Sequence, residues 1–267
     1  MTAIGSPPTV AAWVHPSPWP VLEHRLVIYR RAWRGTVFST FVLPILFLLS
    51  IGVSVGAYVN RTGDLDVSYL DYIAPGVLAS TVLQVGTGEA TWPVMSSFTW
   101  VRTYHAMRAS PLRPRDVVAG ESLYILLRVL LCAVAFLVVM TAFGTVHSWW
   151  APLAVPICLL LGAAVTEPTL AFSATITNDN LFAVFYRFAV IPMTLFAGVF
   201  FPVALMPTWA QWLAYVSPLW HGVELCRSAT LGTATPWPAV VHIGYLALWA
   251  VLGYAAARAR FTRRLAD

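Results

Sequence analysis

The chain has 267 residues, of which 59% are apolar and only 10% are charged. Ordinary soluble domains carry about 25% charged residues, so a soluble core of this size cannot hide so much apolar surface, and lipid must be the solvent for most of it. The composition excludes a large soluble domain and predicts an all-α integral membrane protein with several spans. The net charge of +5 comes from arginine alone, and we interpret it as a topology signal rather than as nucleic-acid binding.

The first part of the chain predicts a tail followed by an amphipathic helix. Residues 1–16 are rich in proline and hold no long apolar run, so we expect a disordered cytoplasmic tail and no cleavable signal peptide. Over residues 17–36, helical spacing places Leu22, Leu26 and Tyr29 on one face, with arginines on the others. Such a helix lies on an anionic membrane surface, or it serves only as a juxtamembrane anchor that sets orientation.

Six apolar segments follow, each longer than the roughly 20 residues that cross a bilayer. The second is softer because it contains proline, glycines and Glu89, and the fourth is interrupted by Glu167 and Pro168. A basic loop (96–118), a broken apolar block (204–235) and a basic cytoplasmic tail (258–267) lie outside the spans. The predicted spans are 37–59, 72–94, 119–143, 152–176, 181–203 and 237–257.

The arginines predict the orientation of these spans. If the N-terminus is cytoplasmic, the inner side collects twelve of the sixteen arginines, and the outer side collects only Arg61 and Arg227. Cytoplasmic loops of membrane proteins carry such an excess of positive charge. We therefore expect a multi-pass protein of the bacterial cytoplasmic membrane, with both termini inside and the broken block 204–235 outside.

The basic loop predicts more than topology. Its first half favours a short helix with basic and apolar sides, which Pro111 and Pro114 end before the next span. Trp100, Tyr104 and Met107 are spaced to share one face, and such side chains are costly to leave in water. A short, rigid, basic helix of this kind fits a groove on a soluble partner. The alternative is a loop that is basic only for topology.

The block after the fifth span is apolar but too broken to cross a bilayer. Pro207 and Pro218 interrupt it, and Trp209 and Trp212 add an aromatic character typical of a membrane edge. Irregular backbone at membrane depth is tolerated only where protein or a water-filled cavity covers it. We therefore predict short re-entrant helices before the last span, at a place where something moves or is admitted.

Acidic and basic residues within the spans are costly and face a bundle interior or a cavity. For Glu89, and for Glu167 beside Pro168, a role as pathway lining or hinge and a structural role are equally open. Glu121 and Arg128 lie two helical turns apart on one face, where we favour charges that are neutralised or paired to hold helices together.

The sequence holds no motif of an enzyme, nucleotide site or metal centre. It has no HExxH, GxSxG, Walker A or glycine-rich dinucleotide turn. The six histidines are scattered without i+3 or i+4 spacing, and the three cysteines form no CxxC pair. We expect no catalytic residue, no metal and no cofactor in this chain.

Three stretches carry a resemblance to a known family. They are SYLDYIAPGVLAS (68–80), TYHAMRASPLRPRDVVAGE (103–121) and FAGVFFPVALMPTWAQWLAYVSPLWHGVELCR (196–227). Together with the order of the predicted parts, they resemble the type-2 ABC exporter permeases of the NodJ-like nodulation-factor and daunorubicin exporter group. The last stretch is the most specific, and the resemblance covers most of residues 20–260.

The resemblance implies a permease without an ATPase of its own. Two ABC ATPase subunits would carry ATP and Mg, and a second permease copy or homologue would complete the complex. Residues 99–113 would be the coupling helix, and residues 207–219 the re-entrant helices that close the exit. The implied ATPase-coupling residues are Trp100, Arg102, Tyr104, Met107, Arg108 and Arg113. The implied outer-gate residues are Phe201, Pro202, Pro207, Trp209, Trp212, Pro218 and His221.

The favoured interpretation is thus the permease subunit of an ATP-driven exporter of an amphiphile, such as a lipid, glycolipid, lipid-linked glycan or hydrophobic drug. Few charges in the spans argue against a small-ion or sugar path. Two alternatives stay open: a proton-coupled secondary transporter that uses Glu89 and Glu167, and a membrane assembly scaffold that transports nothing. A neighbouring reading frame with Walker A and ABC motifs would favour the ATP-driven exporter over both alternatives.

Overall fold

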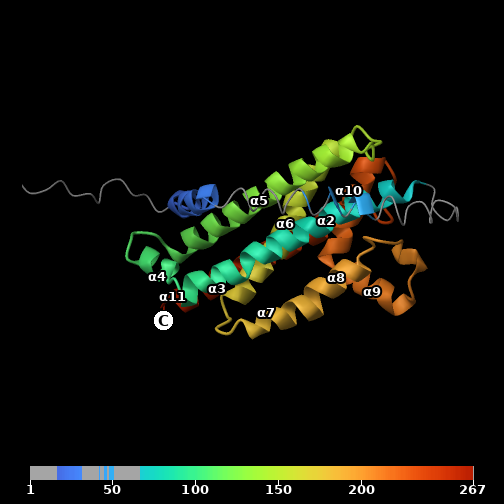
Figure 1. Cartoon of the computed structure of the whole chain (residues 1–267). Helices are drawn as coiled ribbons and strands as arrows, with labels where there is room; N and C mark the ends of the chain where they lie inside the picture. Colours follow the sequence, from blue (N-terminus) through green and yellow to red (C-terminus); the bar gives the residue numbers. More distant parts are fainter. Residues whose placement is uncertain (1–16, 32–41, 43–44, 47, 51–66, 267) are drawn as a thin grey trace, which may run out of the picture.

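The computed structural model describes residues 17–31, 42, 45–46, 48–50 and 67–266. Within these residues every regular element is helical, and four long helices run side by side along an elongated bundle (Figure 1). The predicted tail 1–16 and nearly all of the predicted first span 37–59 lie outside the described residues. The amphipathic helix predicted over 17–36 is described as far as residue 31 and is helical over 19–31.

The helices follow the order in which the sequence predicted apolar segments and breaks. Two short 3-10 turns, Ala151–Leu153 and Val203–Leu205, precede α6 and α9. The helices are α2 (Tyr69–Ala90), α3 (Trp92–Thr99), α4 (Thr103–Arg108), α5 (Pro114–Ala142), α6 (Ala154–Ser173), α7 (Asn180–Phe185), a π-helical segment (Tyr186–Val190), α8 (Ile191–Phe196), α9 (Thr208–Val216), α10 (Pro218–Leu231) and α11 (Ala239–Ala266).

Three of these helices are long and apolar enough to cross a membrane: α5, α6 with its preceding turn, and α11. They correspond to the spans predicted at 119–143, 152–176 and 237–257. Pro114 opens α5 rather than ending a loop helix, because proline is well suited to the first turn of a helix, where its missing N–H is no loss. The count of six spans stays a prediction.

The fifth predicted span, 181–203, is shorter in the structure. Its helix runs from Asn180 to Phe196 through the π-helical segment and ends there. Gly198 follows with φ of 74°, a conformation that glycine adopts without the steric penalty of other residues, and the chain turns back. Pro192 explains the π segment, because it lacks the N–H that would bond Phe188 and its ring crowds that carbonyl.

The last helix is longer than predicted. We expected a basic tail at 258–267, but α11 continues through Ala266. Phe261 and Leu265 are buried, and Arg264 Nη1 donates to the carbonyl oxygens of Ser173 and Ala174, each at 3.1 Å. The basic segment therefore packs onto the end of α6, where its arginine satisfies carbonyls that the helix terminus leaves open.

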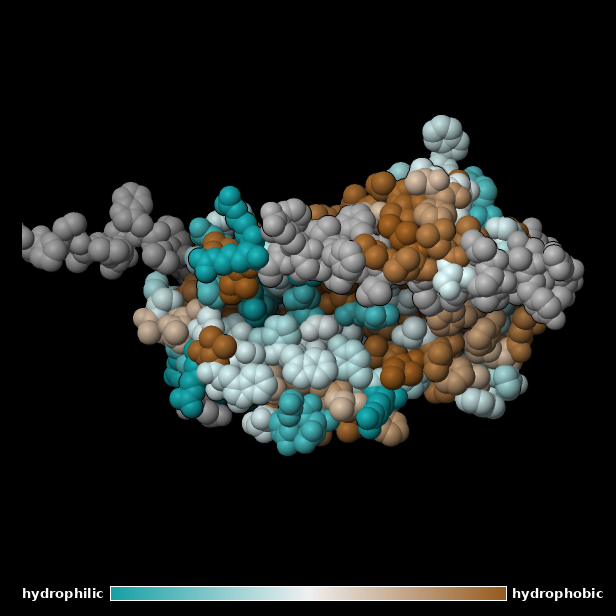
Figure 2. Space-filling model, viewed as in Figure 1, coloured by the Kyte–Doolittle hydropathy of each residue, from teal (hydrophilic) through white to brown (hydrophobic). Residues whose placement is uncertain are grey.

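The centre of the bundle is the contact between α6 and α11. A Cβ on Gly253 of α11 would lie 2.5 Å from Cδ of Pro168 on α6, so only glycine allows this close approach. The surface is divided along its length: hydrophilic side chains gather at the end that holds helix 19–31 and α4, and much of the rest is apolar (Figure 2). The bundle therefore has one arginine-rich end, and the sequence predicts that this end is cytoplasmic.

Candidate functional site

The arginine-rich end is organised around Arg25 on helix 19–31. Its Nε lies 2.7 and 2.9 Å from the two carboxylate oxygens of Glu121 on α5. Its Nη2 donates to Tyr104 Oη of α4 at 3.1 Å and to Ser97 Oγ of α3 at 3.3 Å. One guanidinium thus joins four helices, and we call these four residues the Arg25 network.

Burial and charge act together in this network. Burial opposes the charge on Arg25, but Glu121 and Tyr104 outweigh it and raise the pKa of Arg25. Burial also raises the pKa of Tyr104 well above its usual value, so its hydroxyl stays neutral. The side chain of Glu121 is 2% exposed and that of Arg25 is 13% exposed. A charge-assisted pair this well enclosed is far less screened by salt than a surface pair.

Helix 19–31 is seated on the bundle as its predicted face requires. Leu22, Leu26 and Tyr29 are partly buried, and Val21 is fully buried against Gly120 of α5. A Cβ at Gly120 would lie 2.5 Å from Cβ of Val21, so this glycine makes room for the helix. The helix is therefore docked on α5, and Val27 and Ile28 on its outer side remain exposed.

The loop between α3 and α4 corrects one prediction. We expected Trp100, Tyr104 and Met107 to share a face, but Trp100 is 65% exposed whereas Tyr104 is 1% exposed. Arg102 has φ of 55°, and this left-handed residue breaks the helix between the two aromatics. Tyr104 instead packs edge-on against Phe98, with ring centroids 4.7 Å apart. Its role is inside the protein rather than on a partner.

The other predicted coupling residues lie on the surface around the Arg25 network. Trp100, Arg102, Arg108 and Arg113 are exposed, and Met107 is half-buried. A cavity of about 170 Å³ opens beside them between helix 19–31, α3 and α4. Its lining is Val101, Thr103, Tyr104 and Met107 from the loop, Pro93, Ser96 and Ser97 from α3, His24, Arg25 and Ile28 from helix 19–31, and Glu121 from α5.

Glu121 and Arg128 are both paired, as we favoured, but with partners that the sequence did not indicate. Arg128 Nη1 lies 2.8 Å from Glu89 Oε1 on α2, and its guanidinium stacks over the ring of Tyr29 at 4.8 Å. Arg128 and Glu121 therefore do not neutralise each other along α5. Glu121 instead pairs with Arg25 of helix 19–31, and Arg128 pairs with Glu89 of α2, so the two residues bind different helices to α5.

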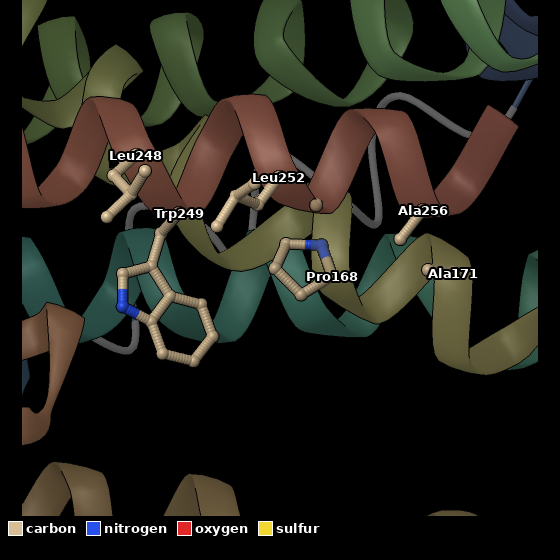
Figure 3. A pocket seen from close by; sticks show the side chains of 7 residues that line it. Pro168, Ala171, Leu248, Trp249, Leu252 and Ala256 are labelled. Carbon is tan, nitrogen blue, oxygen red and sulfur yellow. The ribbon is translucent and has the colours of Figure 1, made fainter. Parts of the chain in front are cut away.

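Glu167 and Pro168, the predicted hinge, lie at the centre of the bundle. Glu167 is 4% exposed, and among the described residues none lies within hydrogen-bonding geometry of its Oε2 or of Thr166 Oγ1. Pro168 lines a groove of about 350 Å³ between α6 and α11, which Figure 3 shows with Leu248, Trp249, Leu252 and Ala256 on its α11 side. The groove is apolar, so hydrocarbon suits it better than a polar solute.

The predicted outer gate divides into an exposed and a buried part. Trp209 and Trp212 on α9, together with Phe201, are exposed, whereas α10 is largely buried from Pro218 onward. Pro207 is the N-cap residue of α9, and Pro218 is the first residue of α10, so the two prolines delimit the helices. Pro202 precedes the 3-10 turn at Val203–Leu205.

His221 is buried, and it contacts a histidine that the sequence did not connect with it. The Nδ1 atoms of His221 and His242 on α11 lie 2.9 Å apart, and His221 Nε2 lies 3.0 Å from the Tyr215 carbonyl oxygen. Since Nε2–H must donate to that carbonyl, His221 Nδ1 accepts from Nδ1–H of His242. Burial lowers the pKa of His221 to about 4; the Tyr215 hydrogen bond opposes this shift and His242 adds to it.

Arg227 at the same end is a functional candidate that the sequence reasoning missed. It is 7% exposed, and its Nη2 donates to the Gly198 carbonyl oxygen at 2.8 Å. Nη1 lies 2.6 Å from Glu224 Oε1, and the guanidinium stacks 4.0 Å from the ring centroid of Tyr72 on α2. This arginine fixes the turn after α8 to both α10 and α2. The i, i+3 spacing of Glu224 and Arg227 is the signal that points to it.

The cysteines and histidines offer no metal centre in the described part of the chain. No group of three His, Cys, Asp or Glu side chains is placed to hold an ion there. Cys132, Cys158 and Cys226 are buried free thiols, and the Sγ atoms of Cys158 on α6 and Cys226 on α10 lie 3.8 Å apart. The arginine-rich end holds a denser network of polar and charged side chains than α9 and α10 do.

Comparison with known proteins identifies similar sequences over nearly the whole chain. Residues 21–231 match the family described as ABC-2 type transporter. "Nodulation protein J" of Rhizobium leguminosarum bv. viciae is 27% identical over 248 residues, covering 90% of this chain and 94% of that protein. "Inner membrane transport permease YadH" of Escherichia coli (strain K12) is 24% identical over 248 residues, covering 88% of this chain and 90% of that protein.

Proposed function

The chain belongs to the ABC-2 type transporter family, as a membrane permease component, and from this membership we propose that it is the permease subunit of an ATP-driven exporter. The proposed cargo is an amphiphile that crosses the cytoplasmic membrane. Two ATPase subunits bind ATP and Mg, and a second permease completes the assembly. Export rather than import is proposed from the resemblance of residues 196–227 to the exporter group described above.

The observation that carries the proposal is the Arg25 network. It fixes α4 to helix 19–31 and to α5, so a push on α4 is transmitted to a long apolar helix rather than absorbed by a loose loop. Trp100, Arg102 and Arg108 surround this fixed helix and point to water. A rigid element with an aromatic and cationic surface suits a protein partner, since buried aromatic and arginine side chains dominate interface energies.

The outer gate in this proposal is the block of α9 and α10. Helix α9, whose tryptophans are exposed, lies at the opposite end of the bundle from α4 (Figure 1). Arg227 and the His221–His242 contact hold α10 against α2 and α11. In the proposed cycle, α9 is the part of the gate that moves, and α10 is the support on which it turns.

The proton-coupled alternative finds support in one residue only. Glu89 is paired with Arg128, which favours a structural role for this carboxylate. Glu167 is enclosed, and one of its carboxylate oxygens has no partner among the described residues, so it is the remaining candidate for a proton site. Cargo transport that is driven by a proton gradient without any ATPase, and that is lost in Glu167→Gln, would favour this alternative over the exporter.

The exporter proposal is tested by binding to an ABC ATPase, which is sought first in the neighbouring reading frame. The test variant combines Trp100→Ala with Met107→Asp, which changes the surface around α4 and leaves Tyr104 in place. We expect recovery of the ATPase with the tagged chain, and the stimulated ATP hydrolysis, to fall by roughly tenfold, because two anchor contacts are lost. The matched control is Trp149→Ala, a 97% exposed tryptophan at the other end of the bundle.

Three results would count against the proposal. One is an unchanged recovery of the ATPase with the double variant. Another is an equal loss with Trp149→Ala, which would show that exposed tryptophans matter only for solubility. The third is the absence of any ABC ATPase that binds the chain.

A further inference from the structure

Arg187 stands apart from the other charged side chains of this bundle. It is the single Asp, Glu, Lys or Arg between Asp179 and Glu224. It lies in the π-helical segment and is exposed. The large side chains exposed along the same helix are all apolar: Leu181, Val184, Phe188, Ile191 and Leu195. An arginine in the middle of a lipid-like surface is expensive and calls for a partner.

The protein itself does not supply that partner in the part of the chain that the structure describes. There Arg25, Arg128 and Arg227 each have a carboxylate within 2.8 Å. The side chain of Arg187 forms neither an ion pair nor a hydrogen bond with any of the described residues. A counter-charge for Arg187 must therefore come from outside the described residues. The anionic groups that are most abundant in a membrane are the phosphates of lipid headgroups.

The position of Arg187 fits a phosphate at the membrane surface. Its helix begins at Asn180, directly after the end of α6, which Arg264 caps at the arginine-rich end of the bundle. Seven residues at about 1.5 Å each place Arg187 about 10 Å from that helix start. An arginine side chain can bridge most of this depth by extending toward the headgroup layer. Its planar guanidinium then binds phosphate through paired hydrogen bonds.

The helix around Arg187 is widened rather than regular. The Ile191 N–H donates to the Tyr186 carbonyl oxygen, which is the longer π-type repeat, immediately before Pro192. Such segments are frequent at functional sites. The aromatic ring of Tyr186 stacks on Trp92 of α3 at 5.5 Å, so one side of the segment is fixed to the bundle while Arg187 stays free on the surface.

We propose that Arg187 binds the phosphate of a membrane amphiphile whose hydrocarbon chains lie along Val184, Phe188 and Ile191, and that this amphiphile is the cargo. Charge complementarity selects the headgroup, and the exposed apolar side chains select the tail. The assignment as cargo rests on the proposed function; the binding of phosphate does not. If the bound amphiphile is the cargo, the substrate class is narrowed to amphiphiles that carry phosphate.

The binding step is tested with the full chain in a maltoside detergent, which contains no phosphate. Two photoactivatable probes with identical chains are compared, a phosphatidic acid and a diacylglycerol, and attachment to residues 181–196 is measured by mass spectrometry. We expect roughly tenfold more labelling by the phosphatidic acid, as expected for a charge-assisted hydrogen-bonded pair. Arg187→Gln removes this preference, Arg187→Lys keeps part of it, and the control Arg260→Gln keeps all of it.

Further arms of the experiment separate the sources of phosphate. If millimolar inorganic phosphate abolishes the labelling, the site binds the free anion, and the amphiphile proposal is overturned. A preference that survives in Arg187→Gln, or that is absent from the unmodified chain, overturns it as well. Retained labelling in the presence of inorganic phosphate supports it.

The cargo step is tested with the permease bound to its ATPase. Turnover of ATP is expected to lower the labelling of residues 181–196 severalfold relative to a non-hydrolysable analogue. Unchanged labelling would identify a fixed lipid and would overturn the cargo assignment alone. If no ATPase binds the chain, the exporter proposal fails, while the comparison of the two probes still decides whether Arg187 binds phosphate.

Discussion

Arg25 and Glu121 lie 96 residues apart in the sequence, and in the structure the Arg25 Nε sits 2.7 Å from Glu121 Oε1. The pair fixes a surface helix to the side of α5 at the point where α4 also contacts the bundle. A carboxylate at the start of a membrane helix is costly without a cation. This cost is offset by Arg25, which belongs to the surface helix 19–31. The position of that helix is therefore determined by the ion pair as well as by its apolar face.

The first prediction concerns this pair. Breaking a buried ion pair from one side leaves an uncompensated charge, which costs about 3–5 kcal/mol when burial is complete. Since Arg25 is partly exposed, we expect about 2 kcal/mol for Arg25→Gln or for Glu121→Gln alone. The double variant should cost less than the sum of the two single losses. Unfolding free energies in detergent, combined in a double-mutant cycle, measure the coupling.

The control for the cycle is Arg115→Gln with Asp116→Asn. Their atoms are 3.7 Å apart, and the Arg115 side chain is 46% exposed. Although the Asp116 side chain is only 8% exposed, its partner reaches solvent, and we expect the coupling between the two to be less than about 1 kcal/mol. Strict additivity at Arg25 and Glu121, as at the control pair, would mean that the pair does not hold the helix.

The second prediction concerns the hydroxyl of Tyr104. Tyr104→Phe keeps the ring against Phe98 and Phe261 but removes the acceptor of the 3.1 Å bond from Arg25. We expect a loss of about 1–2 kcal/mol in the unfolding free energy, the usual worth of a hydrogen bond to a charged group. ATPase stimulation should fall without a change in ATPase binding, because the phenol is inside the protein. A loss of binding alone would place Tyr104 on the partner surface after all.

The sequence indicates where long apolar helices lie, because length and composition are local properties. The segments 119–143, 152–176 and 237–257 correspond to α5, α6 and α11. The sequence could not predict where α11 ends, because a cluster of arginines after an apolar span usually indicates a cytoplasmic tail outside the helix. Arg264 instead caps α6, while Phe261 and Leu265 bury their side chains. That outcome depends on a neighbour more than 90 residues away.

The candidate sites were predicted by region but not by contact. The loop 96–118 was identified from its composition. In the structure, however, the left-handed Arg102 separates Trp100 from Tyr104, so that Trp100 is exposed and Tyr104 is buried. Periodicity assumes a continuous helix, and it fails at such a break. The pairing of Glu89 with Arg128, and of His221 with His242, arises from packing between helices, which periodicity within one helix does not encode.

The third prediction is a pH dependence from His221. The unfolded chain binds a proton at this residue below a pH of about 6.5, whereas the fold keeps it neutral down to about 4. The unfolded state therefore binds more protons in that window, and stability is lost as the pH falls. Between pH 6.5 and pH 5 the loss should approach about 2 kcal/mol. Thermal or urea unfolding at several pH values measures it.

Among the described residues, no carboxylate is hydrogen-bonded or ion-paired to His221 that would offset this loss. The rings near it belong to Trp220, Trp237, His242 and Tyr245. His221→Gln should flatten the pH dependence, whereas the exposed His105→Gln should leave it unchanged. A slope in His221→Gln equal to that of the unmodified chain would assign the effect to other groups.

The fourth prediction compares two glycines of α11. At Gly253 a Cβ would lie 2.6 Å from the backbone nitrogen of Pro168, and backbone cannot move aside cheaply. Gly253→Ala should therefore separate α6 from α11 and cost about 1–3 kcal/mol, the usual penalty of overpacking. At Gly244 nothing lies within 4 Å of the added carbon, so Gly244→Ala should gain up to about 1 kcal/mol from helix propensity.

The two substitutions are chemically identical and lie on one helix, so their difference isolates the contact with Pro168. If this contact is also the hinge of the transport cycle, Gly253→Ala should reduce transport by more than its loss of stability explains. Transport assays at a temperature where both variants are fully folded separate the two effects. Equal transport by both variants at that temperature would limit Pro168 and Gly253 to a packing role.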